Sequence, residues 1–221
     1  MVEIIREIPW GELEQMVRKV PLKMEKPDKS KVFVYENAHI ELRTVMPEEL
    51  AASSFYLVQK SADFQRSLHD SLLKAGYDTL HLRGGLEIKN DQGELWRLIP
   101  PVVEVMHEDV AHVNTRGDID YAGKPAKVAV HIVNDGMHRV ALARERRTSV
   151  SIIHVSGIPA EFPYYALPNG WDQVRTFTDV PKTKPEKKLY RRNDCYALYR
   201  DFDVLGCGKP RNTGAGEVVK P

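Results

Sequence analysis

The sequence predicts an α+β fold built around a mixed α/β-type sheet. The first observation is an apolar run at 128–133, which is typical of a buried strand. Helical periodicity follows through Val140 and Leu142, and a second apolar run lies at 150–155. This strand–helix–strand unit is a compact supersecondary signal. The third observation is a set of short alternating runs, such as 86–89, which favour antiparallel strands.

The first 76 residues are expected to be a helical and strand addition packed on that core. The longest helix is predicted from Pro47, a residue suited to a first turn, to Gly76, a residue suited to a helix end. Apolar side chains recur every seven residues along it and predict a core-facing stripe. Shorter elements are expected before it: a helix at 10–20 and strands at 32–35 and 40–45.

Residues 77–176 are expected to form the nucleotide-site core, and residues 177–221 a basic linker, a short helix and a tail rich in Gly and Pro. Short core strands are expected at 79–82, 86–89, 94–99 and 102–105, with a polar loop or hairpin at 107–126. In the last part, the short helix is expected at 194–202 and the tail from 206 onward.

Charge and cysteine content exclude several classes of protein. The 221 residues hold 32 Lys and Arg against 31 Asp and Glu, so bulk charge does not favour coating of nucleic acid. Two cysteines, Cys195 and Cys207, cannot form a disulfide framework and are expected to be reduced thiols. No apolar run is long enough for a signal peptide or a membrane span. We therefore expect a cytoplasmic protein with no membrane partner.

The informative segment is Asn134–Arg139 (Asn-Asp-Gly-Met-His-Arg), where a buried strand turns into a helix. Backbone N–H groups at a helix start lack internal acceptors and, with the helix dipole, favour an anion. His138 and Arg139 place cations at this positive end, which costs about 0.3–1 kcal/mol. A bound phosphate would reverse the sign, with a bidentate contact from Arg139 and a hydrogen bond from His138. From spacing alone, an ordinary turn with Asp135 as helix cap is the alternative.

The run 132–143 (Ile-Val-Asn-Asp-Gly-Met-His-Arg-Val-Ala-Leu-Ala), followed by the strand at 150–155, resembles the core of the ParB/sulfiredoxin-like superfamily. The segment 98–104 is similar to the stretch that enters the same site in that superfamily. The resemblance covers residues 80–175 and implies a nucleotide-binding core. It places the nucleotide phosphates on Gly136, Met137, His138 and Arg139.

The motif can be compared with those of three branches of the superfamily. Sulfiredoxins have a reactive cysteine where this chain has Met137, so sulfinic-acid reductase activity is disfavoured. ParB partition proteins carry a helix-turn-helix domain after the core, and the sequence after Arg175 lacks two amphipathic helices at that spacing. The free-serine kinases carry an Asp-Gly-x-x-Arg turn, which Asp135 to Arg139 matches. The motif is therefore most similar to the kinase branch.

That resemblance implies a kinase that transfers a phosphoryl group to a small hydroxylated acceptor, such as the free amino acid serine. It implies Asp135 and an upstream glutamate as catalytic residues; we choose Glu104, with Glu94 as the alternative. Asp135 is expected to act as base toward the acceptor hydroxyl and Glu104 to support the acceptor or the metal, or the reverse. The implied cofactors are ATP or ADP, with CTP as an alternative, and Mg²⁺ held through the nucleotide, Asp135 or Glu104.

A second hypothesis is a ParB-like, nucleotide-binding, DNA-associated module without kinase activity. Its role would be in partition or regulation, or would be nuclease-like. The module would contact nucleic acid through the basic segment 182–192, for which a solvated linker is the alternative. Tyr165 and Trp171 are candidates for the wall of an acceptor or base pocket, with core packing as the alternative. The eight histidines lack the spacing of a zinc site.

Overall fold

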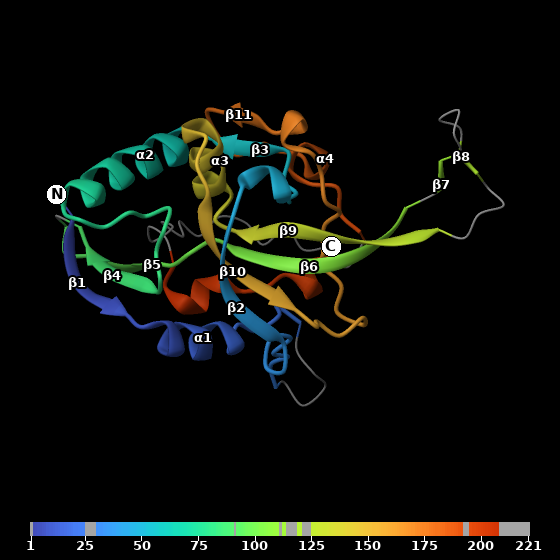
Figure 1. Ribbon diagram of the computed structural model, residues 1–221, viewed down its shortest axis with the longest axis horizontal. Helices are drawn as coiled ribbons and strands as arrows, with labels where there is room; N and C mark the ends of the chain where they lie inside the picture. Colours follow the sequence, from blue (N-terminus) through green and yellow to red (C-terminus); the bar gives the residue numbers. More distant parts are fainter. Residues whose placement is uncertain are drawn as a thin grey trace.

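A four-stranded mixed sheet forms the centre of the molecule (Figure 1). The computed structural model describes residues 2–24, 30–90, 92–110, 112–113, 119–120, 125–191 and 195–207. The sheet order is β2 (His39–Val45), β10 (Val150–Ser156), β6 (Val102–Val110) and β9 (Ala126–Asp135). β10 and β6 run parallel, and the other two pairings are antiparallel. With α3 (Met137–Arg146) between β9 and β10, the predicted strand–helix–strand unit and the α+β class are confirmed.

Helices cover both faces of this sheet (Figure 1). α3 packs on one face, where Val140 and Leu142 join a buried cluster with Val103, Val133 and Ile152. α1 (Trp10–Arg18) belongs to the cluster on the other face, and its buried Leu13 and Val17 confirm the helix predicted at 10–20. Two short turns near the end of the chain complete that cluster: η3 (Cys195–Leu198) and η4 (Phe202–Leu205).

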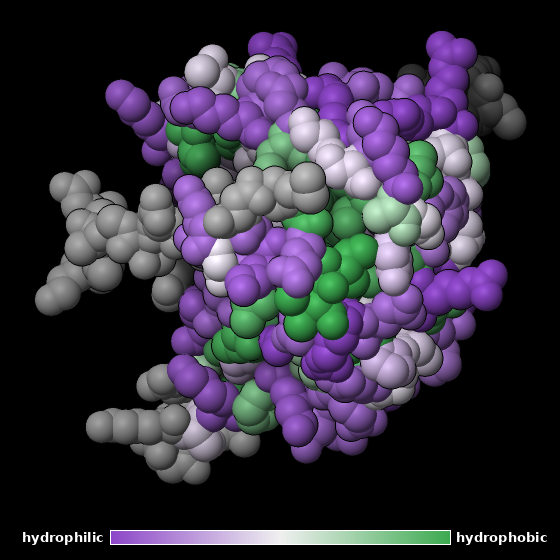
Figure 2. Space-filling view, turned by 90° about the vertical axis from the view of Figure 1, so that its left-hand side faces the viewer, coloured by the Kyte–Doolittle hydropathy of each residue, from purple (hydrophilic) through white to green (hydrophobic). Residues whose placement is uncertain are grey.

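A second, antiparallel sheet has the order β1 (Glu3–Ile8), β4 (Gly85–Lys89) and β5 (Leu95–Leu98). α2 (Gln59–Lys74) covers it, with Leu68 and Leu72 in one cluster with Trp96. Figure 2 faces this end of the molecule, where apolar side chains gather in the middle of a polar surface. β1 and β2 each form an edge of a sheet, so the first 76 residues contribute to both sheets.

The remaining elements are short. They are η1 (Pro47–Glu49), β3 (Tyr56–Val58), β7 (His112–Val113), β8 (Ile119–Asp120), η2 (Trp171–Gln173), β11 (Arg175–Phe177) and α4 (Lys184–Lys187). β3 and β11 pair in parallel, and β7 and β8 pair near the far end of the long β6–β9 hairpin (Figure 1). Much of the predicted hairpin at 107–126 and the predicted tail beyond Cys207 lie outside the described residues. None of the helices in the described ranges has the length and apolar character needed to cross a bilayer.

The helix predicted from Pro47 to Gly76 is wrong in its first half. There the chain makes η1, runs beside β9 at Ala51, and then forms the short strand β3. Ala51 N donates to His131 O at 2.8 Å, and Val133 N donates to Ala51 O at 3.0 Å. Because this tertiary pairing satisfies the backbone, no helix is needed there. α2 forms the second half and ends as predicted before Gly76, whose φ is 87°.

The strands predicted at 32–35 and 79–82 are also wrong, because the first segment leads into a turn and the second is a turn. The guanidinium of Arg18 donates to three carbonyl oxygens around the first segment. In the second segment, the Asp78 carboxylate accepts from Leu80 N at 2.9 Å. Such side-chain contacts offer the backbone an alternative to strand pairing.

The joint between β9 and α3 requires a glycine for two separate reasons. Gly136 has a φ of 89°, in the left-handed region that disfavours other residues. A Cβ atom at this position would lie 2.7 Å from Pro101 Cβ and 2.9 Å from Pro101 Cα. The strand–helix turn therefore presses directly against the Pro100–Pro101 step that leads into β6.

We expect Gly136→Ala to lower the free energy of unfolding by about 2–4 kcal/mol, since left-handed strain and overpacking add. Gly157→Ala is the matched control, because Gly157 also has a positive φ (76°) but its nearest atom, His39 N, lies 3.9 Å from the added Cβ. That variant should lose only about 1 kcal/mol. Urea unfolding of both variants measures the difference, and equal losses would contradict the close approach of Pro101.

Candidate functional site

A cleft of about 630 Å³ opens beside the turn between β9 and α3. The turn residues Asn134 to Arg139 form one wall. Ser53 and Tyr56, from the segment between η1 and α2, lie on its lining with Ser61 and Phe64 of α2. The last part of the chain contributes four further side chains: Tyr165, Lys188, Tyr199 and Cys207. The cleft thus brings together residues that are far apart in the sequence.

The start of α3 lies at this cleft without a side-chain cap. Gly136 occupies the cap position and has no side chain to offer the helix. The first amides of a helix lack intrahelical acceptors, so Met137 and His138 present N–H groups at the positive end of the dipole. The anion site that the sequence predicts at residues 136–139 stays a prediction, and these N–H groups would be its donors.

His138 is held as a neutral imidazole. Its Nε2 accepts a hydrogen bond from Val58 N at 3.1 Å, so the proton of the neutral ring lies on Nδ1. Burial lowers the pKa of His138, and this outweighs the raising effect of the Asp135 charge. The predicted conflict between this side chain and the helix dipole is thereby removed.

Arg139 is also buried, with 6% of its surface exposed. Its Nη1 donates to the carbonyl oxygen of Ile99. Burial lowers the pKa of Arg139, against the opposing charge of Asp135. The side chain ties the predicted 98–104 segment to the turn, and this contact, rather than a phosphate, is the partner of its Nη1.

Glu104 lies in the core and not on the cleft lining. Only 1% of it is exposed, and Arg200, also 1% exposed, faces it. Arg200 Nε donates to Glu104 Oε1 at 2.8 Å and Nη2 donates to Oε2 at 3.0 Å. Tyr35 OH and Asn134 Nδ2 donate to the same Oε1. All of these donors belong to the protein, so the carboxylate has a complete set of internal partners.

The alternative glutamate, Glu94, lies in the β4–β5 turn. Its Oε2 accepts from Asn90 Nδ2 at 2.6 Å, and it does not line the cleft. Of the three predicted acidic candidates, the structure therefore brings only Asp135 to the cleft.

Lys188 is the cleft residue that the sequence did not single out. Its Nζ donates to Tyr165 OH at 2.6 Å and lies 4.8 Å from the centre of that ring, with Ser53 Oγ at 3.5 Å. Burial lowers its pKa to about 8, and the charge of Asp135 opposes this shift. No carboxylate in the described part of the chain forms an ion pair with Lys188. The only signal in the sequence was its place in the basic segment 182–192.

Comparison with known families gives the assignment. A family model described as the ParB CE domain matches residues 12–175, well over half of the chain. The chain belongs to the ParB CE domain family. The match confirms the predicted ParB-like relationship and includes most of the first 76 residues. No curated protein and no solved structure matches the chain.

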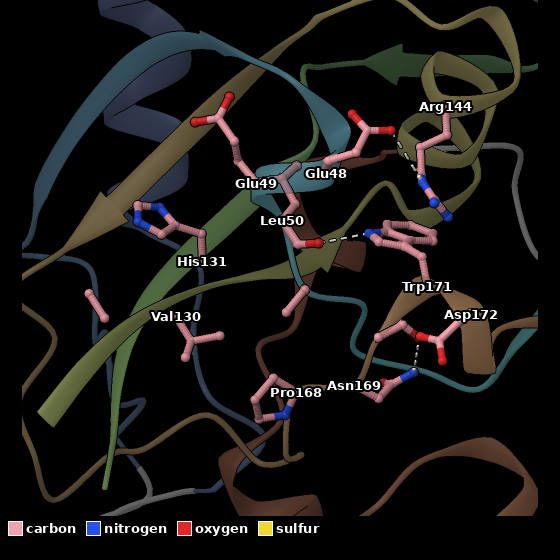
Figure 3. A pocket seen from close by; sticks show the side chains of 13 residues that line it. Glu48, Glu49, Leu50, Val130, His131, Arg144, Pro168, Asn169, Trp171 and Asp172 are labelled. Atoms are coloured by element: carbon pink, nitrogen blue, oxygen red, sulfur yellow. Dashed lines mark hydrogen bonds and ion pairs between the residues drawn. The ribbon is translucent and has the colours of Figure 1, made fainter. Parts of the chain in front are cut away.

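In this ParB CE domain, the two aromatic candidates lie in different pockets. Tyr165 lines the cleft and carries the hydroxyl bound by Lys188. Trp171 lines a second pocket of about 560 Å³ (Figure 3). There its Nε1 donates to Leu50 O at 2.7 Å, and Arg144 lies 5.2 Å from its ring centre. Trp171 is therefore not placed with the other candidates.

The basic segment 182–192 of the ParB CE domain is partly used inside the protein. Lys188 points into the cleft, and Arg191 pairs with Glu108 of β6. Lys182 and Lys184 are exposed, while residue 192 lies outside the described ranges. Lys188 and Arg191 thus have internal contacts, Lys182 and Lys184 face water, and Lys187 is half-buried.

The environment of the cysteine in the cleft favours the neutral thiol. Burial and the charge of Asp135 raise the pKa of Cys207 to about 12. Within the described residues, no three His, Cys, Asp or Glu side chains form a group that could hold a metal ion. The cleft therefore offers Asp135 as a single acidic ligand rather than a protein-built metal cage.

We expect Arg200→Met to lower the free energy of unfolding by about 3–5 kcal/mol, since it leaves Glu104 charged, buried and without a cation. Arg146→Met is the control, because it breaks an exposed pair with Asp70 (2.7 Å) and should lose less than about 1 kcal/mol. Urea unfolding compares the two variants. If the first does not fold, Glu104→Gln combined with Arg200→Met should recover folding; losses of equal size in the two single variants would contradict the role of the pair.

We expect acid to destabilise the domain partly through His138. The pKa of His138 is lower in the folded than in the unfolded chain, so the unfolded chain takes up more protons below about pH 6.5. The free energy of unfolding therefore falls as the pH falls through that value. His138→Gln keeps an acceptor for Val58 N and does not titrate, so its stability should fall less between about pH 7.5 and about pH 5.5. Parallel pH curves for the two proteins, measured by urea unfolding, would contradict the neutral state of His138.

Proposed function

We propose that this ParB CE domain is a nucleotide-dependent phosphotransferase acting on the hydroxyl of a small acceptor. The observation that carries the proposal is Lys188, a cation in the cleft without a carboxylate partner, which shares the lining with the uncapped start of α3 and with Asp135. A buried or half-buried charge is costly unless an opposite charge compensates it. An anionic ligand in the cleft would supply that charge.

A nucleotide polyphosphate fits this environment best. The first amides of α3 would bind one phosphate group and the Lys188 ammonium another, so together they would neutralise charge on the polyphosphate. His138 and Arg139 would act through the turn, since His138 Nε2 and Arg139 Nη1 already contact the protein backbone. ATP, ADP and CTP share the polyphosphate that this site would recognise.

Asp135 would act as the base. It is the acidic candidate on the cleft lining, so its carboxylate would accept the proton of the acceptor hydroxyl as the oxygen attacks the terminal phosphorus. The bond from that phosphorus to the nucleotide breaks, and the shortened nucleotide leaves. Mg²⁺ would enter with the phosphates and take at most Asp135 from the protein, where it would neutralise phosphate charge. Glu104 has no part in this scheme because its partners are internal.

The acceptor is proposed to be a small hydroxylated compound such as free serine. The resemblance of the Asp135–Arg139 turn to that of the free-serine kinases supports this choice. The serine and tyrosine hydroxyls of the cleft, including Ser53 and Tyr165, would contact a polar acceptor.

The second candidate is a nucleotide-binding, DNA-associated module without turnover. Membership of a ParB-like family and the exposed Lys182 and Lys184 support it. Such a module would bind duplex DNA with an affinity that falls steeply with salt. Both candidates require the same nucleotide cleft, so nucleotide binding without acceptor-dependent turnover, together with salt-sensitive DNA binding, would select the second.

We expect ATP, ADP or CTP with Mg²⁺ to raise the melting temperature of the protein, because a ligand that binds the folded state stabilises it. Lys188→Met should weaken binding of that nucleotide by about tenfold or more, because a charge-assisted hydrogen bond is lost. Lys188→Arg retains the charge and should bind more tightly than Lys188→Met. Asp135→Asn should keep binding but lose acceptor-dependent release of the shortened nucleotide. No shift with any nucleotide overturns the proposal, and full turnover by Asp135→Asn removes Asp135 from the mechanism.

The same measurement has a pH dependence. The pKa of Lys188 is lowered to about 8, so the ammonium loses its proton as the pH rises through that value. Nucleotide affinity should therefore fall between about pH 7 and about pH 9.5 in the original chain and stay nearly constant in Lys188→Arg, whose guanidinium remains charged. Equal pH profiles would show that Lys188 does not contact the phosphates.

A further inference from the structure

Among the described residues, the outer edge of β9 is covered only near its end. β9 is the last strand of the central sheet, and β6 occupies its inner side. On the outer side, Ala51 bonds to His131 O and to Val133 N. Peptide groups two residues apart on a strand point to the same side, so those of Ala129 and Lys127 also face outward. No residue in the described ranges hydrogen-bonds to them, and Ala126 to Ala129 are exposed.

A pocket lies along this uncovered edge (Figure 3). The chain leaves the edge at Leu50, because η1 turns it away from β9. The space is about 560 Å³, with Ala129, Val130 and Pro168 among its apolar lining residues. It is the position that one more strand of the sheet would occupy. Uncovered edges of this kind accept an added strand.

The lining of the pocket is acidic. Three carboxylates line it: Glu48, Glu49 and Asp172. The lining residues include one arginine, Arg144, and no lysine. Arg144 is already engaged, since it packs on Trp171 and lies 3.7 Å from Glu48 Oε1. The side chain of Glu48 is still 60% exposed. The excess of carboxylates favours a cationic occupant.

We propose that the outer edge of β9 binds an extended protein segment in which basic and apolar residues alternate. The segment would pair with the outward peptide groups of Ala129 and Lys127. It would thus extend the hydrogen bonding that Ala51 makes to the outer edge of β9. Because strand side chains alternate, one set would face Glu48 and Glu49 and should be basic. The other set would face Val130 and Pro168 and should be apolar. Main-chain hydrogen bonds would supply affinity, and the acidic rim would supply the preference for cations.

The probe is a short capped peptide of alternating valine and lysine, with a valine–glutamate peptide as its matched control. Fluorescence anisotropy of the labelled peptides on the full chain should show binding of the first and at least about tenfold weaker binding of the second. Glu48→Gln with Asp172→Asn should reduce that preference. Absence of binding by the valine–lysine peptide overturns the proposal, and so does equal binding of the two peptides.

Backbone substitutions test the strand pairing itself. Two isomers of the peptide carry N-methyl groups either at the odd-numbered or at the even-numbered residues. They have the same charge and composition, but only one of them lacks the N–H groups that face β9. One isomer should lose binding by about tenfold or more and the other should retain it. Ala129→Pro should mimic the loss, since it deletes an outward N–H without removing a β6 bond, and Ala129→Ser should not. Equal behaviour of the isomers, or self-association through this edge without peptide binding, overturns the proposal.

Discussion

The buried contact between Glu104 and Arg200 holds together parts of the chain that no local signal connects. Besides Glu104, Arg200 donates to carbonyl oxygens of Phe162 and Pro163, so it fastens the segment after β10 to β6. Tyr35 and Asn134 complete the shell of Glu104. Such a pair is stable only when its remaining hydrogen bonds are made, and here they are made by Tyr35, by Asn134 and by the carbonyl groups of 162–163. Removing one partner would therefore disturb the central sheet, the turn that holds Tyr35 and the end of β9 together.

The cleft depends on this contact because Asn134 immediately precedes Asp135. Asn134 Nδ2 is held by Glu104 at the point where the β6–β9 register shifts, and Asp135 follows it at the cleft lining. Gly136 then turns the chain against Pro101, and Arg139 binds Ile99 O. The hydrogen bonds made by His138 and Arg139 within the protein thus hold the α3 amides and the Asp135 carboxylate in place. Lys188 is then a cleft cation that forms no salt bridge with a carboxylate among the described residues, although the charge of Asp135 acts on it.

The parts of the fold that could be predicted are those fixed by local pattern. Apolar runs and helical periodicity were sufficient for β9, α3 and β10, and the glycine of the motif identified the strand–helix turn. The helix predicted from Pro47 failed because Ala51 pairs with β9, about eighty residues away in sequence. Asp135 could be predicted as a site residue because it belongs to the turn motif, and the turn lines the cleft. Glu104 could be recognised as unusual, but its partner Arg200 could not, since nothing local links the two. Lys188 was hidden in a basic run whose members differ only in tertiary surroundings.

The segment from Leu50 to Ser54 separates the cleft from the pocket at the edge of β9. Leu50 and Ala51 line the edge pocket, whereas Ser53 and Ser54 line the cleft. Trp171 Nε1 bonds to Leu50 O at 2.7 Å, and Asn169 Nδ2 bonds to Ser54 O at 3.3 Å, so both ends are held by the 169–171 turn. An added strand would contact one side of this segment while a nucleotide would contact the other. Because close-packed interiors transmit small displacements, the two sites share a wall through which occupancy of one can alter the other.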